Sequence, residues 1–94
     1  MTQTIQLSAN LDVLASAPLK AALVAARGAP VSLDASDVQR FGGLCLQVLL
    51  AARRQWASDG ARFEIVRTSA AFLEQARLLG ATEALGLSHE GALA

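Results

Sequence analysis

Three short segments of alternating apolar and polar residues are each followed by a longer segment with helical periodicity. The alternating segments, whose period of two is typical of half-buried β-strands, are Thr2–Leu7, Pro30–Asp34 and Arg62–Val66. The segments with apolar residues every three or four positions, typical of amphipathic helices, are Val13–Arg27, Leu44–Ser58 and Ser69–Leu79. This repeated order predicts an α/β fold with parallel neighbouring strands and right-handed crossovers.

We therefore expect one α/β domain, with a mixed or parallel sheet of about four strands packed with three to four helices. Its 94 residues suffice for one domain with a buried core that needs no disulfide or metal. The expected core runs from about residue 4 to residue 87. Within it, Ala81–Leu87 is expected to form a short last helix or strand, and residues 88–94 a flexible tail.

Composition excludes several classes of partner. The formal net charge is +0, whereas a nucleic-acid-binding domain needs excess positive charge to neutralise phosphates. No apolar run approaches the ~20 residues of a membrane span, and the N-terminal MTQTIQ does not resemble a signal peptide. We therefore expect a cytoplasmic protein that neither binds nucleic acid nor inserts directly into a membrane.

The inventory of reactive side chains is equally restrictive. A single cysteine, Cys45, excludes a multi-thiolate zinc site, and a single histidine, His89, argues against a His-based metal site or a Ser-His-Asp triad. The glycine-rich phosphate-binding patterns GxGxxG and GxxxxGK[ST] are both absent. We predict no catalytic residue, no metal and no cofactor, and hence a protein that is not an enzyme.

Three features admit a chemical and a structural interpretation. Cys45 lies in the first turn of a predicted helix, where the helix dipole lowers a thiol pKa, yet its apolar neighbours favour a buried packing role. Asp34 and Asp37 form an acidic pair that suits cation binding or acid-base chemistry, or simply ends a strand and caps a turn. Trp56 is either a ligand platform or, as its helical phase favours, an anchor of the helix against the sheet.

The most informative element is the predicted helix that begins at Leu44. Its inward arc contains Cys45, Leu46, Leu49, Leu50, Ala52 and Trp56, and its outward stripe contains Leu44, Gln47, Ala51, Arg54 and Ser58. The outward stripe opens with a leucine directly after two glycines, which favours a partner-binding role, although isolated exposed leucines are common. We name as the predicted partner surface the residues Gln39, Arg40, Gly42, Gly43, Leu44, Gln47, Ala51 and Arg54.

The run VSLDASDVQRFGGLCLQVLLAARRQWASDGARFEIV resembles the STAS domain, the fold of anti-sigma-factor antagonists. Asp34, Ser36 and Val38 match the family's strand end and the residues after it. The helix that follows is matched by Leu46, Gln47, Leu49, Leu50 and Ala51. The resemblance extends from Ile5 to about Leu87 and implies a single STAS-like domain that acts as a non-catalytic protein-interaction module in bacterial signal transduction.

The chain departs from the family at the phosphorylation position. The family's Asp aligns with Gly42, and its phosphorylated Ser or Thr aligns with Gly43. Glycine has no hydroxyl group, so a phosphorylation switch at Gly43 is excluded. Thr68 and Ser69 are the remaining candidates for modification, although capping of the next helix explains them as well.

The compact form is most similar to small single-domain STAS proteins encoded with chemotaxis kinases in alphaproteobacteria. That resemblance implies an adaptor that binds a CheA-like histidine kinase and helps to drain phosphate from a response regulator. Two alternatives stay open. One is the STAS subunit that stabilises the ATPase of a bacterial phospholipid ABC transporter, and the other is an anti-sigma-factor antagonist that lacks the phosphorylatable serine.

Overall fold

Each of the three predicted strands pairs in parallel with its neighbour in the computed structural model of the chain, which describes residues 2–87. The strands β1 (Gln3–Gln6), β3 (Val31–Asp34) and β5 (Phe63–Val66) form a sheet in the order β1-β3-β5. The helices are α1 (Val13–Ala25), α2 (Gly43–Ser58) and α3 (Ala70–Leu78). The predicted α/β class and the three predicted helices are therefore confirmed.

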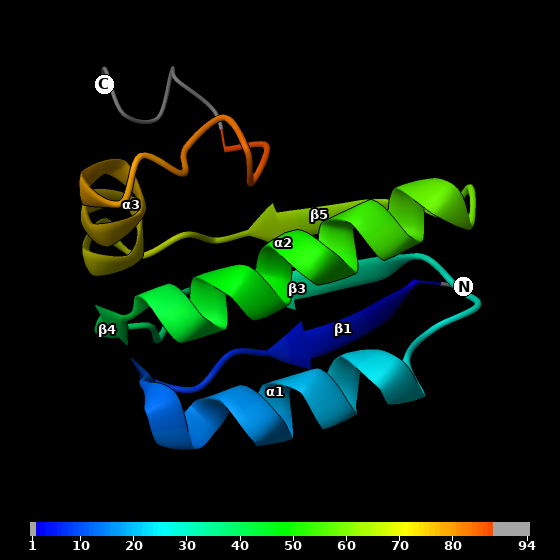
Figure 1. Cartoon of the computed structure of the whole chain (residues 1–94), viewed down its shortest axis with the longest axis horizontal. Helices are drawn as coiled ribbons and strands as arrows, with labels where there is room; N and C mark the ends of the chain where they lie inside the picture. The colour runs from blue at the N-terminus through cyan, green and yellow to red at the C-terminus, as the bar shows by residue number, and fades with distance from the viewer. Residues whose placement is uncertain (1, 88–94) are drawn as a thin grey trace.

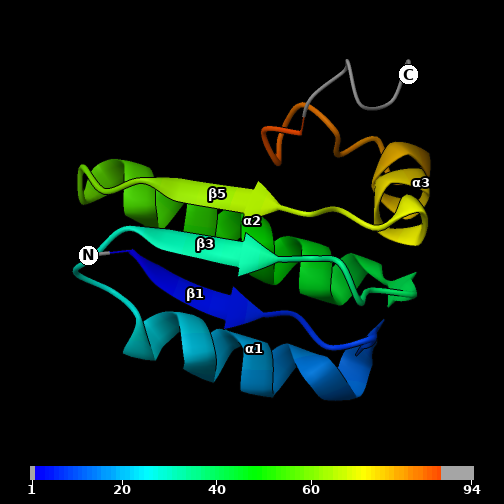
Figure 2. The same cartoon turned by 180° about the vertical axis from the view of Figure 1, so that it is seen from behind.

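Helices α1 and α2 lie side by side on one face of the sheet, and Figure 2 shows that no helix of residues 2–87 covers the opposite face. Strand register explains the difference between the two faces. Leu33 pairs with Ile5 and Ile65 and is fully buried beneath the helices. Thr4 and Glu64, one position earlier on their strands, point to the open face and are exposed. Within residues 2–87, no helix has the length and apolar character needed to cross a membrane.

A second, two-stranded parallel pair joins β2 (Asn10–Leu11) to β4 (Arg40–Phe41), and the sequence analysis did not predict it. Strands of two residues are too short to show a periodicity. The expectation of about four strands in one sheet is thus corrected to a sheet of three and a separate pair among residues 2–87. The pair fixes the start of α2, because the Gly42 N–H donates to the Leu11 carbonyl at 3.0 Å.

Helix α3 lies beside β4 (Figure 1), and the side-chain amide of Gln75 connects the two. Its Oε1 accepts the Phe41 N–H at 2.5 Å, and its Nε2 donates to the Gln39 carbonyl at 3.0 Å. The Phe41 and Phe72 rings stack beside this clamp, with centroids 4.7 Å apart. Among residues 2–87, β4 pairs with β2 alone. The Gln75 side chain therefore supplies the hydrogen-bond acceptor for the Phe41 N–H that a second neighbouring strand would otherwise provide.

The segment Ala81–Leu87 forms consecutive turns, so the expected short helix or strand is corrected. The turns still bury apolar side chains, namely Ala81, Leu85 and Leu87. Arg53 of α2 donates from Nη1 to the Ala84 carbonyl at 2.8 Å and holds the segment against the helix. The expected flexible tail, residues 88–94, lies outside the described residues.

We predict that Gln75→Ala lowers the free energy of unfolding by about 1–2 kcal/mol, because its hydrogen bonds to Phe41 of β4 and to the preceding Gln39 are lost. Glu74→Ala is the matched control, since its ion pair with Arg77 is exposed and its loss should change the free energy of unfolding far less than Gln75→Ala does. Urea denaturation measures both variants. Equal stability of the two variants would contradict a structural role for the Gln75 clamp.

Candidate functional site

The start of α2 combines an open backbone with an exposed leucine. Gly42 caps the helix without a side-chain hydrogen bond, and Gly43 is the first helical residue. A Cβ atom built on Gly43 would meet no atom within 4 Å, so a partner has free access to this backbone. Leu44 follows with 48% of its surface exposed. The predicted outward stripe is confirmed as solvent-facing, because Gln47, Ala51 and Arg54 are also exposed.

The opposite side of α2 is buried, as its predicted phase requires. The buried residues of the helix are Cys45, Leu46, Leu49, Ala52 and Trp56. The Trp56 indole donates to the Ala29 carbonyl at 2.9 Å, and its ring lies 5.9 Å from that of Phe63 on β5. The interpretation of Trp56 as an anchor between helix and sheet is confirmed.

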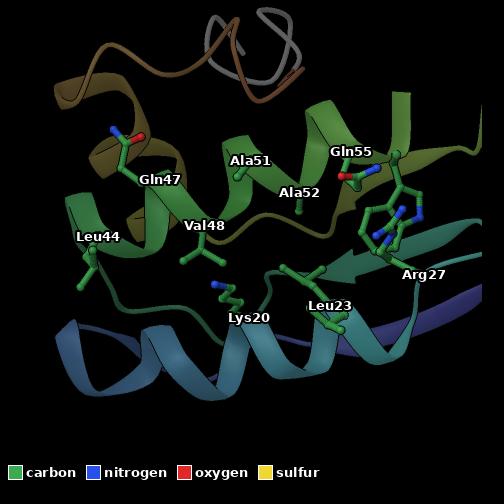
Figure 3. Close-up of a pocket in the computed structure, with 11 residues that line it drawn as sticks. Lys20, Leu23, Arg27, Leu44, Gln47, Val48, Ala51, Ala52 and Gln55 are labelled. Carbon is green, nitrogen blue, oxygen red and sulfur yellow. The ribbon is translucent and has the colours of Figure 1, made fainter. Parts of the chain in front are cut away.

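A groove of about 360 Å³ lies between α1 and α2, and we call it the α1–α2 groove. Helix α1 contributes Lys20, Leu23, Val24 and Arg27, and helix α2 contributes Leu44, Gln47, Val48, Ala51, Ala52, Gln55 and Trp56. Figure 3 shows Leu44 at one end, Arg27 and Gln55 at the other, and Val48 facing α1 between them. The lining includes two cationic side chains and no carboxylate.

The structure places the predicted partner surface in two groups. Leu44, Gln47 and Ala51 line the α1–α2 groove, whereas Gln39, Arg40 and Arg54 are exposed outside it. Sequence reasoning missed the groove's α1 wall because it treated each helix alone. The available signal was the composition of α1, where Lys20 is the only charged residue among thirteen.

A second, more polar cavity of about 550 Å³ opens at the carboxyl ends of β1 and β3, between Gln6, Ser36, Asp37 and Ser69. Asp37 accepts a hydrogen bond from Gln6 Nε2 at 3.2 Å. Hydrogen bonds from the side chain and the backbone N–H of Ser36, together with the charge of Arg67, hold the pKa of Asp34 below its ordinary value. The side chains of Asp34 and Asp37 thus form hydrogen bonds that stabilise the turn after β3, which is the structural interpretation of the pair.

Residues 2–87 contain no group of three or more potential ligand side chains arranged to hold a metal ion. The Asp34–Asp37 pair stands at the end of β3 with its oxygens engaged by Ser36, Arg67 and Gln6. A hard cation would need further oxygen ligands at this point. The contacts of Asp34 and Asp37 therefore indicate a structural role for both carboxylates.

Cys45 is fully buried, and its thiol donates to the Asp12 carbonyl at 3.3 Å. Burial, with a smaller contribution from the Asp12 charge, raises the pKa of Cys45. Burial disfavours the charged thiolate, and the packing role that the apolar neighbours of Cys45 favour is confirmed. The sulfur is a packing group held in its protonated form.

Ser69 is the N-cap of α3, as predicted. Its hydroxyl accepts the Phe72 N–H at 3.0 Å and donates to the Val38 carbonyl. Both hydrogen-bonding functions of this hydroxyl are therefore occupied by the fold. Thr68 is partly buried beside it, and His89 lies outside the described residues.

A protein-family model described as "Mlab, STAS domain" matches residues 1–87 of the chain. A search of curated proteins found no match. The matched span includes every described strand and helix, together with the start of α2 and both walls of the α1–α2 groove. STAS domains generally act as non-enzymatic interaction modules. The chain belongs to the STAS domain family.

Proposed function

We propose that the chain is a non-catalytic docking module of the bacterial cytoplasm that binds a protein partner through the predicted partner surface. The observation that carries this proposal is Leu44, an apolar side chain left 48% exposed at the start of α2 beside an unobstructed glycine backbone. An apolar anchor with adjacent hydrogen-bonding groups, here Gln47 and the backbone, is the usual centre of a protein interface.

The partner we propose is a CheA-like histidine kinase, with binding that modulates phosphate flow to a response regulator. The resemblance of the sequence to STAS proteins encoded with chemotaxis kinases supports this choice. Arg40 and Arg54 suit such docking, because within residues 2–87 neither has an ion-pair partner. Exposed arginines of this kind orient an acidic partner and increase its association rate.

A second candidate partner is the ATPase of a phospholipid ABC transporter, for which the chain would be a structural subunit. The similarity of the sequence to the small STAS subunit of that transporter supports this candidate, and the family model that matches residues 1–87 is described as "Mlab, STAS domain". An anti-sigma-factor antagonist is a weaker alternative because Gly43 has no hydroxyl. Titration of the purified chain with a purified chemotaxis kinase and, separately, with a purified transporter ATPase distinguishes the two candidates by which one binds.

We predict that Leu44→Asp weakens partner binding by roughly 30-fold, equivalent to about 2 kcal/mol, while leaving the fold intact. Leu49→Asp, in contrast, should unfold the domain, because it buries an unpaired charge where the wild-type leucine has no exposed surface. Circular dichroism melting and a binding titration with the purified kinase measure the two effects.

Leu78→Asp is the matched control, since Leu78 on α3 is 68% exposed and lies outside the predicted partner surface. It should fold and bind like the wild type. Wild-type affinity of Leu44→Asp would place the interface elsewhere. Unfolding of Leu44→Asp would show that Leu44 contributes to the core.

We predict that incubation with the partner kinase and ATP yields no phosphopeptide from residues 42–44. Gly43→Ser supplies the missing acceptor and should fold normally, because the space around its Cβ atom is open. Phosphopeptide mapping of both proteins tests this, because it resolves phosphate in residues 42–44 from phosphate on Thr68 or Ser69. Stoichiometric phosphate on Ser36 of the wild type would contradict the loss of the family switch.

We predict that Cys45 of the folded protein reacts slowly with a thiol reagent, and that denaturant accelerates the reaction at least 100-fold. The reason is that the thiol is fully buried and burial raises its pKa. A time course of labelling at neutral pH with and without urea measures the ratio. Rapid labelling of the folded protein would revive a reactive-cysteine function.

A further inference from the structure

The solvent-facing side of α1 is almost entirely apolar. Val13, Leu14 and Val24 have 69%, 84% and 60% of their surfaces exposed. Between them Ala17 and Ala21 are also exposed, and the only charged side chain of the helix is Lys20. A helix on the surface of a globular protein ordinarily presents polar residues to water. A covering group that makes contact with this side of α1 would bury the exposed apolar area.

This apolar side continues into the α1–α2 groove. Val24 belongs to both, and Figure 3 shows Lys20 and Leu23 of α1 facing Val48 of α2 across the groove. The groove is concave, with about 360 Å³ between the two helices. A flat lipid surface cannot fill such a groove, whereas the side-chain ridge of a third helix packs into the space between two others.

The charged side chains that line the groove indicate the charge expected on its occupant. Arg27 is neutralised by Asp59 at 3.3 Å, but Lys20 has no ion-pair partner within residues 2–87. No carboxylate lines the groove. A second copy of the chain, related by a two-fold axis at the groove, would bring Lys20 near its own symmetry mate. Like charges at close range disfavour this arrangement, whereas a carboxylate on the occupant would pair with Lys20.

We infer that the α1–α2 groove binds an amphipathic helix of the partner protein, with apolar residues that enter the groove and acidic residues that face Lys20. The inference rests on the proposed docking function and adds the chemistry of the partner segment. Leu44 links the two, because it belongs to the predicted partner surface and closes one end of the groove. A helix as long as the thirteen residues of α1 spans roughly 20 Å and would cover the exposed side of α1.

The test uses three synthetic helical peptides of about 14 residues, the length that matches α1. The first has leucines at every third or fourth position and glutamates on the flanks. The second replaces each glutamate with lysine, and the third has the composition of the first in scrambled order. Trp56 is the only tryptophan and lines the groove, so its fluorescence reports binding without a label. Amide chemical shifts of the isotope-labelled protein locate the site.

We expect the acidic peptide to bind at least 10-fold more tightly than the lysine and scrambled peptides, with shift changes confined to α1 and α2. Val24→Asp should reduce this affinity at least 10-fold, and Lys20→Glu should reverse the preference between acidic and basic peptides. Both side chains are exposed, so both variants should melt like the wild type. The control Leu78→Asp should bind the acidic peptide unchanged.

Several outcomes overturn the inference. These are equal binding of the acidic and basic peptides, no binding at millimolar concentration, and wild-type affinity of Val24→Asp. Self-association in sedimentation that Val24→Asp abolishes would assign the groove to a second copy. Val24-dependent binding to phosphatidylcholine–phosphatidylglycerol vesicles would assign it to a membrane.

The purified kinase separates this inference from the proposed function. If Leu44→Asp and Arg54→Glu weaken kinase binding while Val24→Asp and Lys20→Glu do not, the docking function stands and the helix-binding groove fails. If the acidic peptide binds with the expected dependence on Val24 and Lys20 but the kinase does not bind at all, the groove stands and the kinase assignment fails.

Discussion

The arrangement of this molecule depends on the order of its three main strands. A parallel sheet in the order β1-β3-β5, connected by crossovers of one hand, requires α1 and α2 to lie on the same face. That face carries Ile5, Leu33 and Ile65, so the two helices bury the apolar side of the sheet and each other's flanks. The α1–α2 groove follows from this packing, because two helices that lie side by side on one sheet leave a groove between them on the side that faces away from the sheet.

Under the proposed function, helix α2 serves both folding and recognition. Its buried side, with Leu49 and Trp56 at its centre, holds the helix on the sheet and fixes its rotation. The rotation then determines which residues face outward, so Leu44 is exposed because Leu49 is buried. The pair β2–β4 adds the second constraint, because the hydrogen bond from Gly42 to Leu11 sets where α2 begins. Core substitutions that rotate or shift α2 would therefore move the residues of the proposed interface, although no interface residue is itself changed.

Much of this was predictable from the sequence because the signals are local. Alternation identified β1, β3 and β5, and the three-to-four spacing in α2 gave both its buried arc and its exposed stripe. The failures concern tertiary contacts. Two-residue strands such as β2 exist only because a partner strand lies beside them, and the turns of Ala81–Leu87 are held by Arg53 of a distant helix. The α1 wall of the groove was missed for the same reason. The buried packing role of Cys45, in contrast, was favoured by its apolar neighbours in the sequence and is confirmed.

The glycine at position 43 has a consequence for regulation under the proposed function. A phosphate at the start of a helix would add about 1.5 to 2 negative charges and would interact favourably with the helix dipole. Gly43 cannot accept that group, so the charge at the start of α2 is constant. Under the proposed function, occupancy of this surface therefore depends on the concentrations of the chain and its partner and on the conformation of the partner, not on a phosphate at Gly43.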